Sequence, residues 1–207
     1  MNKFNFLPFL LVMSSPLAGI SQYCTVAGPS SANDSNIGSV SLIGETTSIS
    51  YTGCPGVIGV EDQTAQVADV IGGNTYSVDL VYGTCGGSYG NAAEVWIDFN
   101  GNQTFDANES IGTWVGTPTS SSVTYSFTVP SNALNGTHRI RVMQHEGGVI
   151  PLDPCGTFTW GSVTDFSIAI SGGTSCMSVS ALNTDGFSAD SVFFSWAAGG
   201  TERMVCR

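Results

Sequence analysis

The chain has 207 residues, enough for one or two domains, and 42% of them are hydrophobic, so it can bury a core although only 10% are charged. Five Lys and Arg residues stand against 16 Asp and Glu, and the net charge of −11 excludes nucleic acid and anionic membrane surfaces as partners. The same charge fits a protein that works outside the cell and needs divalent cations.

Residues 1–21 have the pattern of a secretory signal peptide. Lys3 precedes a short apolar run, Phe4–Met13, and Gly19-Ile20-Ser21 places small residues where signal peptidase cuts. The run is too short to span a membrane, and no later segment approaches the required length. The sequence therefore predicts cleavage before Gln22 and export to the medium or the cell surface, without a membrane span.

The residues after the signal peptide predict an all-β fold. Short runs rich in Val, Ile, Thr, Tyr and Phe are separated by Gly, Asn, Ser and Pro, and no segment keeps a helical period. This spacing predicts an antiparallel β-sandwich of jelly-roll or immunoglobulin-like type over residues 22–171. The predicted strands lie near Gly38–Ile43, Thr75–Val81, Ala93–Asp98, Ser110–Val115, Val123–Val129, Thr137–Val142 and Val163–Ile170.

Two adjacent acids, Glu61 and Asp62, follow a Gly- and Val-rich run. We assign them to a solvated loop, with a role as extra cation ligands as the alternative.

The segment Gly86-Gly87-Ser88-Tyr89-Gly90 matches the esterase pattern Gly-x-Ser-x-Gly, but that motif requires a strand-turn-helix elbow in an α/β fold. Neither segment therefore predicts catalysis.

The stretch from Trp96 to Glu109 carries the strongest functional signal. An apolar strand runs into a loop with oxygen-bearing side chains at alternate positions, as in calcium loops. The candidate ligands, counted from position 1, are Asp98, Asn100, Asn102, Thr104 (through its backbone carbonyl), Asp106 and Glu109. The alternative is an Asn- and Gly-rich turn without a metal.

One feature of a calcium loop is missing. Position 6, usually glycine, is Gln103, so we expect the sharp turn to be made in another way. With few charged ligands and no such glycine, the expected calcium affinity is weak, with a Kd of roughly 10⁻⁴–10⁻³ M.

Of the histidines and tryptophans, His138 and Trp96 are assigned structural roles. His138 shares a strand face with apolar residues and is predicted to be structural. His145-Glu146 lacks the second histidine that a zinc protease requires. Trp96 is expected in the core, whereas Trp160, in a loop-like segment, is the better candidate for stacking against a sugar.

The six cysteines are Cys24, Cys54, Cys85, Cys155, Cys176 and Cys206. None forms a Cys-x-x-Cys pair, so zinc is not expected, and an even number in an exported chain indicates disulfides. Spacing leaves 15 connectivities open. Among them we predict Cys85–Cys155 and Cys24–Cys54.

Several segments, in this order and spacing, resemble the GEVED domain, a β-sandwich module of large secreted bacterial proteins, over about residues 23–171. They are Tyr23-Cys24, Trp96-Ile97-Asp98-Phe99-Asn100 with Phe105 and Glu109, Gly136-Thr137-His138-Arg139-Ile140-Arg141-Val142, Pro154-Cys155 and Gly161-Ser162-Val163-Thr164-Asp165-Phe166. The last segment stands where the family has Gly-Glu-Val-Glu-Asp-Tyr, so Ser162 and Thr164 replace its two glutamates.

The end of the chain forms an incomplete second β unit. Small residues at 171–174 mark the boundary, and residues 175–207 hold two strand-like runs ending in Phe193-Phe194-Ser195-Trp196. This segment resembles the start of a fibronectin type III domain, and it is too short for a complete sandwich.

Two classes of function are compatible with these observations. The first is a non-catalytic, calcium-stabilised adhesion or structural module of a secreted or cell-surface multidomain protein. The second is a carbohydrate-binding accessory module of an extracellular hydrolase. The expected partner is accordingly a cell-surface protein or an extracellular polysaccharide.

Overall fold

The computed structural model describes residues 23–118 and 121–173, and the backbone of 182–187 and 192–196. The predicted signal peptide, Cys176 and Cys206 lie outside the described residues. No helix in the described part of the chain is long and apolar enough to cross a membrane.

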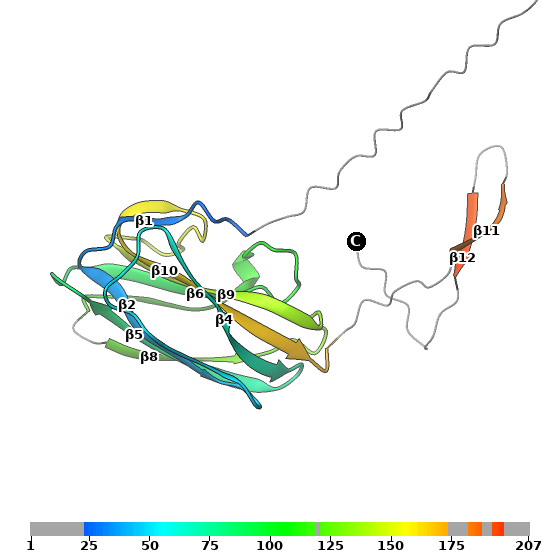
Figure 1. The fold of residues 1–207 in the computed structure, drawn as a ribbon, viewed down its shortest axis with the longest axis horizontal. Helices are drawn as coiled ribbons and strands as arrows, with labels where there is room; N and C mark the ends of the chain where they lie inside the picture. Colours follow the sequence, from blue (N-terminus) through cyan, green and yellow to red (C-terminus); the bar gives the residue numbers. More distant parts are fainter. Residues whose placement is uncertain (1–22, 119–120, 174–181, 188–191, 197–207) are drawn as a thin grey trace, which may run out of the picture.

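Two sheets packed face to face form a β-sandwich, which confirms the predicted fold class (Figure 1). The larger sheet has the strand order β1-β10-β9-β6-β7, with β4 also paired to β10. Its strands are β1 (Gly28–Ser31), β4 (Val60–Ile71), β6 (Asn91–Ile97), β7 (Ser110–Gly116), β9 (Gly136–Glu146) and β10 (Thr157–Ser171). The smaller sheet, ordered β3-β2-β5-β8, consists of β2 (Ser35–Ile43), β3 (Ser48–Thr52), β5 (Thr75–Thr84) and β8 (Ser121–Thr128).

All seven predicted strands are present, and sequence reasoning missed β1, β3 and β4. The assignment of Glu61 and Asp62 to a loop was wrong, because both lie in β4, where they pair in parallel with Thr164 and Asp165 of β10. The beginning of β4 is polar and only partly buried, so it lacks the alternation of a half-buried strand. Pairing with a distant strand, rather than local pattern, makes this segment extended.

The main core lies between the sheets. Fully buried side chains from alternate strand positions fill it, among them Leu42, Leu80, Val95, Ile140 and Phe166. The apolar face of β8 points into this core, since Phe127 is buried and Tyr125 packs against the cluster.

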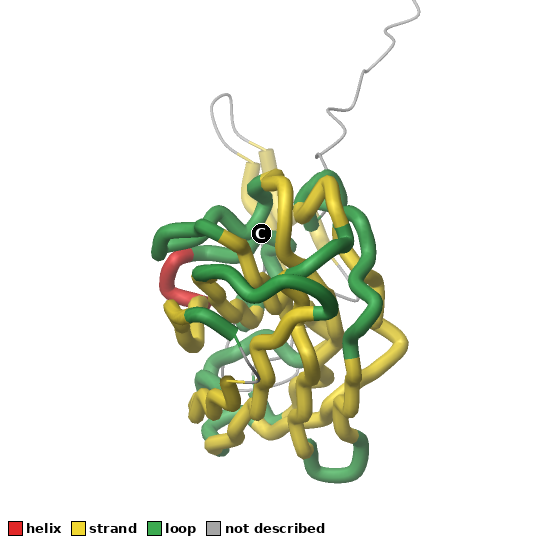
Figure 2. The backbone as a smooth tube through the Cα atoms, turned by 90° about the vertical axis from the view of Figure 1, so that its left-hand side faces the viewer, coloured by secondary structure: helices red, strands yellow, loops and turns green. Residues whose placement is uncertain are grey.

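A second, smaller cluster lies on the other face of the larger sheet. Trp96 and Met143 are buried there together with Ala92, Leu152 and Val163. Two loops supply its cover: Phe105 comes from the 98–109 loop, and Ile150 comes from the 147–156 loop. Figure 2 shows the short 3-10 turn η1 (Ala107–Glu109, red), which closes the 98–109 loop, beside other loops at one side of the strands.

The disulfides are Cys24–Cys155 and Cys54–Cys85, so the predicted pairing was wrong. Topology explains both bonds. Strand β1 runs parallel to the start of β10, which brings the segments before these two strands together. Strands β3 and β5 both pair antiparallel with β2 and end near its first residues, so the cysteines that follow them meet.

Strands β11 (Leu182–Phe187) and β12 (Val192–Trp196) pair antiparallel in a separate two-stranded sheet. They correspond to the two strand-like runs predicted in residues 175–207.

Candidate metal site and its supporting network

The 98–109 loop is folded by its own side-chain oxygens. The Asn100 Oδ1 atom accepts a hydrogen bond from Asn102 N at 2.8 Å. The Asn102 Oδ1 atom accepts two hydrogen bonds from Thr104, from the backbone N at 2.8 Å and from Oγ1 at 2.7 Å. Such bonds to the backbone two residues on are the usual way in which Asn forms a turn, and here two such turns follow each other.

Asp98 stands at the start of the loop and is fully buried. Its Oδ1 accepts a hydrogen bond from Gly101 N at 2.7 Å, and its Oδ2 accepts one from Gln103 N at 3.1 Å. The Tyr23 hydroxyl donates a further hydrogen bond to Oδ2 at 2.5 Å. A buried carboxylate needs such donors, because removal of its hydration is costly.

Gln103 makes the sharp turn at position 6 itself, contrary to our expectation. Its φ of 64° lies in the left-handed region that a glycine normally occupies, and Gly101 has a φ of 70°. For a residue with a side chain this conformation costs roughly 1–2 kcal/mol. The bond from Gln103 N to Asp98 is one of the contacts that offset this cost.

Glu109 closes the loop from its far end. Its Oε1 accepts hydrogen bonds from Phe99 N at 3.0 Å and Asn100 N at 3.3 Å, and its Oε2 accepts one from Asp106 N at 3.1 Å. Burial raises the pKa of Glu109, the backbone N–H groups of Asp106 and Asn100 lower it, and the negative charges of Asp98 and Asp106 raise it. A cation beside this carboxylate would stabilise its charged form.

Asp106 joins the remaining candidate ligands. Its Oδ2 accepts hydrogen bonds from the side-chain amides of Asn100 at 3.2 Å and Asn102 at 3.0 Å. All six predicted ligands therefore belong to one hydrogen-bonded loop.

The donor set consists of oxygen atoms only, which suits calcium. Within residues 23–118 and 121–173, no group of three or more His, Cys, Asp and Glu is arranged to hold a metal ion. A site in this loop would therefore depend on the amide oxygens of Asn100 and Asn102 and on a backbone carbonyl, which are ligands that calcium accepts.

Tyr23 connects the loop to the larger sheet. Its ring lies 5.3 Å from the ring of Phe105, measured between centroids, and the Arg139 guanidinium carbon is 4.5 Å from the Tyr23 ring centroid. Burial raises the pKa of Tyr23, and the hydrogen bond to Asp98 raises it further. The phenol is therefore a neutral donor at all ordinary pH values.

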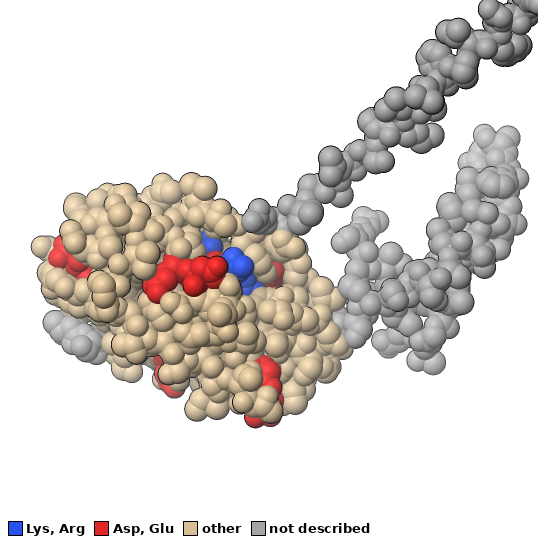
Figure 3. All heavy atoms as spheres, in the orientation of Figure 1, with Lys and Arg blue, Asp and Glu red and all other residues tan. Residues whose placement is uncertain are grey.

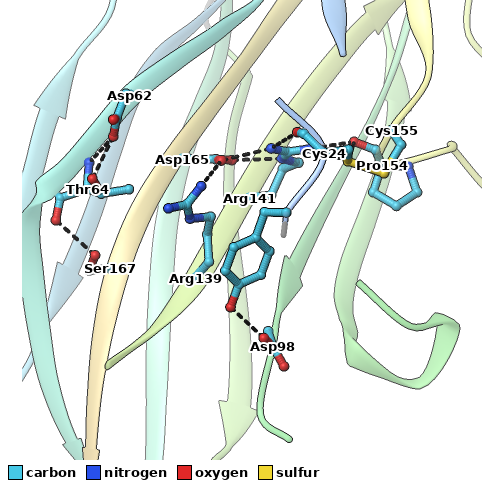
Figure 4. A network of polar contacts seen from close by, with 11 residues as sticks. Cys24, Asp62, Thr64, Asp98, Arg139, Arg141, Pro154, Cys155, Asp165 and Ser167 are labelled. Atoms are coloured by element: carbon cyan, nitrogen blue, oxygen red, sulfur yellow. Dashed lines mark hydrogen bonds and ion pairs between the residues drawn. A yellow bond between two sulfur atoms is a disulfide. The ribbon is translucent and has the colours of Figure 1, made fainter. Parts of the chain in front are cut away.

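Arg141 lies behind Tyr23 and is fully buried. Its Nε and Nη2 donate to the two oxygens of Asp165 at 2.7 and 2.8 Å, and a second Nη2 bond reaches Cys24 O at 2.9 Å. Its Nη1 contacts Pro154 O at 2.7 Å and Cys24 Sγ at 3.0 Å. These contacts account for all five N–H groups of a guanidinium, and Figure 4 shows them spanning the disulfide and the sheet.

Sequence reasoning recorded Arg139 and Arg141 only as part of a family motif and assigned them no role. The available signal was two cations at alternate positions of a strand, which places both on one face. Asp165 is the direct partner of Arg141 across the β9–β10 ladder. Arg139 is only partly buried and donates a hydrogen bond to Asp165 through Nη1 at 3.2 Å.

The surface around this network is mainly uncharged. Figure 3 shows the blue arginine atoms adjoining a run of red carboxylates, with further red patches elsewhere on the same, mainly tan face. The hydroxyl and the backbone N–H of Thr64 lower the pKa of Asp62 on β4, and the charge of Arg139 lowers it further. Glu61 accepts a hydrogen bond from the Tyr51 hydroxyl at 2.6 Å, so the structure gives both acids protein partners.

His138 and Trp96 take the structural roles expected of them, whereas Trp160, expected in a loop-like segment, lies in strand β10. His138 is buried and its Nε2 lies 2.6 Å from Leu134 O. Trp96 is buried, whereas Trp160 is 45% exposed. The Gly86–Gly90 segment joins β5 to β6 in an all-β fold and forms no strand-turn-helix elbow.

Two hollows lie under the 147–156 loop. One, of about 400 Å³, is lined by Met143, by Leu152 and by the stacked rings of His145 and Phe158, whose centroids are 4.2 Å apart. The other, of about 340 Å³, is bounded by Gln103, Thr104 and Phe105 of the 98–109 loop and by the Cys24–Cys155 disulfide. Asp153 borders both hollows.

The sequence model of one protein family, the GEVED domain, matches residues 92–169. This segment contains the 98–109 loop, both arginines and Asp165, and it runs from β6 into β10. The comparison supports the resemblance seen in the sequence for this part of the chain. No curated protein matches the chain.

Proposed function

We propose that this protein is a non-catalytic adhesion or structural module of a secreted or cell-surface multidomain protein, and that calcium stabilises its 98–109 loop. The resemblance to the GEVED domain supports a module of this kind. The predicted signal peptide supports export, and two disulfides in the described residues are consistent with an extracellular protein.

The observation that carries the calcium proposal is the arrangement of the loop. Six oxygen-bearing residues at calcium-loop spacing fold into one unit around a buried Asp98 and a buried Glu109. In addition, the backbone at position 6 takes the left-handed turn of such loops even though the residue is Gln103. Asp98 and Asp106 bring two further negative charges close enough to raise the pKa of Glu109, and a bound cation would balance these charges.

A thermal melt with and without calcium tests the proposal. With the expected Kd of roughly 10⁻⁴–10⁻³ M, a calcium concentration ten times the Kd adds about 1.4 kcal/mol to the free energy of unfolding. Because Asp98 and Glu109 also hold the backbone, the test variants are the isosteric Asp98→Asn and Glu109→Gln. Asp79→Asn on β5 is the matched control.

We expect the midpoint of the wild type and of Asp79→Asn to rise between chelator and millimolar calcium. The midpoints of Asp98→Asn and Glu109→Gln should stay unchanged. Equal wild-type midpoints under the two conditions would show that the loop is only a turn.

The second candidate function is carbohydrate binding, and the hollow lined by His145 and Phe158 favours it. Aromatic rings and a carboxylate, here Asp153, are suitable partners for the faces and hydroxyls of a sugar. A glycan array probed with the exported protein, with and without calcium, tests this candidate. Binding that Phe158→Ala abolishes would favour it over the structural module.

We propose that residues 175–207 belong to a second module. Residues 175–207 lie beyond the matched segment, and their resemblance to the start of a fibronectin type III domain stays a prediction. Tandem β modules of this type suit a secreted multidomain protein.

A further inference from the structure

We infer that Tyr23 is a positioning residue for the calcium ligand Asp98, and that the Cys24–Cys155 disulfide holds Tyr23 in place. The loop then reaches its full calcium affinity only with this disulfide formed. The inference rests on the proposed calcium function and adds to it a segment of chain far from the loop in sequence.

The first step is the occupancy of the Asp98 carboxylate. A carboxylate offers about four lone-pair sites. Tyr23 OH and Gln103 N occupy the two sites of Oδ2, and Gly101 N occupies one site of Oδ1. The remaining site is therefore on Oδ1. By filling the second Oδ2 site, the Tyr23 hydroxyl fixes the rotation of the carboxylate and leaves one site of Oδ1 for a cation.

The second step is the contact of Tyr23 with the rest of the loop. Its ring packs against Phe105, which belongs to the same loop, and against the guanidinium of Arg139 on β9. Phe105 packs in turn near the buried Trp96, with 6.4 Å between ring centroids. Tyr23 thus holds the loop at two points, Asp98 and Phe105, and ties both to the sheet.

The third step is what holds Tyr23 itself. Residues 23–27 precede β1 and belong to no strand, so no sheet ladder holds them. Cys24 is anchored by its bond to Cys155, and its carbonyl oxygen accepts a hydrogen bond from Arg141 Nη2 at 2.9 Å. Without the disulfide, the ordering of this segment has to be completed when calcium binds, which lowers the affinity.

The second disulfide supplies a matched control. Cys54–Cys85 links the ends of β3 and β5 in the smaller sheet, and neither cysteine lines the hollow beside the 98–109 loop. Its removal is expected to lower the stability of the sandwich without affecting the calcium ligands. A general loss of stability can therefore be separated from a loss of positioning.

The experiment measures the calcium Kd of the exported protein by isothermal titration calorimetry. The variants are Tyr23→Phe, the pair Cys24→Ser/Cys155→Ser, and the control pair Cys54→Ser/Cys85→Ser. Melts in chelator report the stability of each variant without calcium. Tyr23→Phe keeps the ring and removes only the hydroxyl, so it serves as the test even if the Cys24→Ser/Cys155→Ser pair fails to fold.

We expect Tyr23→Phe to raise the Kd about 3- to 10-fold, because calcium binding must then also fix the rotation of the Asp98 carboxylate. The Cys24→Ser/Cys155→Ser pair should raise it at least about tenfold, because the whole segment is released. The control pair should change the Kd less than about twofold, even where its melting temperature falls.

A wild-type Kd retained in Tyr23→Phe overturns the positioning role of the hydroxyl. A shift of the same size in both cysteine pairs overturns the role of Cys24–Cys155. The proposed function fails in a different way, because the wild type itself then shows no calcium binding.

Discussion

Replacement of Arg141 by methionine is expected to destabilise the domain severely. The side chain is fully buried, and its five N–H groups contact Asp165, Cys24 and Pro154. Methionine fills much of the same volume but donates nothing. Asp165, itself buried, then keeps only the 3.2 Å contact with Arg139.

The size of the effect follows from this loss of partners. The removal of one member of a buried ion pair costs about 3–5 kcal/mol, because the other charge is left uncompensated. For a domain of this size, that loss corresponds to a fall in Tm of roughly 6–20 °C. Since domains are typically stable by only about 5–15 kcal/mol, this loss removes a substantial part of the free energy of unfolding.

Urea unfolding followed by tryptophan fluorescence measures the change. Arg139→Met is the closest control, because Arg139 is only partly buried and makes one longer contact with the same carboxylate, in addition to its contact with the Tyr23 ring. Its expected cost is at most about 2 kcal/mol, for one partly exposed ion pair and one ring contact. The double variant Arg141→Met/Asp165→Leu should recover much of the loss, since no charge is then left buried.

A loss below about 1 kcal/mol in Arg141→Met would refute the reasoning, because so small a cost is typical of exposed pairs. Equal effects of Arg141→Met and Arg139→Met would refute it too. The buried fork of hydrogen bonds would then be no more important than a surface contact.

Two further predictions concern residues away from the loop. Burial raises the pKa of Tyr51, and its hydrogen bond to Glu61 raises it further, so the folded state keeps a proton that the unfolded state loses near its ordinary pKa of 10.0. The stabilisation should therefore be fully present below about pH 10, and the free energy of unfolding should fall as the pH rises above it. The fall should be less steep in Tyr51→Phe. Urea unfolding at several alkaline pH values would measure both. Gly161 has a φ of 141°, and a Cβ there would meet the backbone oxygen of Gln144. Gly161→Ala should lower the free energy of unfolding by about 1–3 kcal/mol. Gly90→Ala is the control and should be near neutral, because the space around Gly90 is open. Equal effects of the two substitutions would contradict the requirement for glycine at position 161.

The sequence by itself determined the fold class and the loop. Alternating apolar residues and turn residues predicted seven strands, because a period of two and a buried face leave a local pattern. The oxygen-bearing residues from Asp98 to Glu109 lie within one short loop, so their spacing alone brings them together. The local hydrogen bonds of Asn100 and Asn102 need no distant partner.

The tertiary structure decided everything that joins distant segments. Strand β4 forms because β10 pairs with it, which its polar start does not reveal. The disulfides follow from which strand ends meet, so their spacing in the chain carried no information about the pairing. Tyr23 meets Asp98 across 75 residues, and Arg141 meets Cys24 across 117. Such contacts depend on sheet order and register, which arise from the packing of the whole sandwich and leave no periodic trace in any one segment.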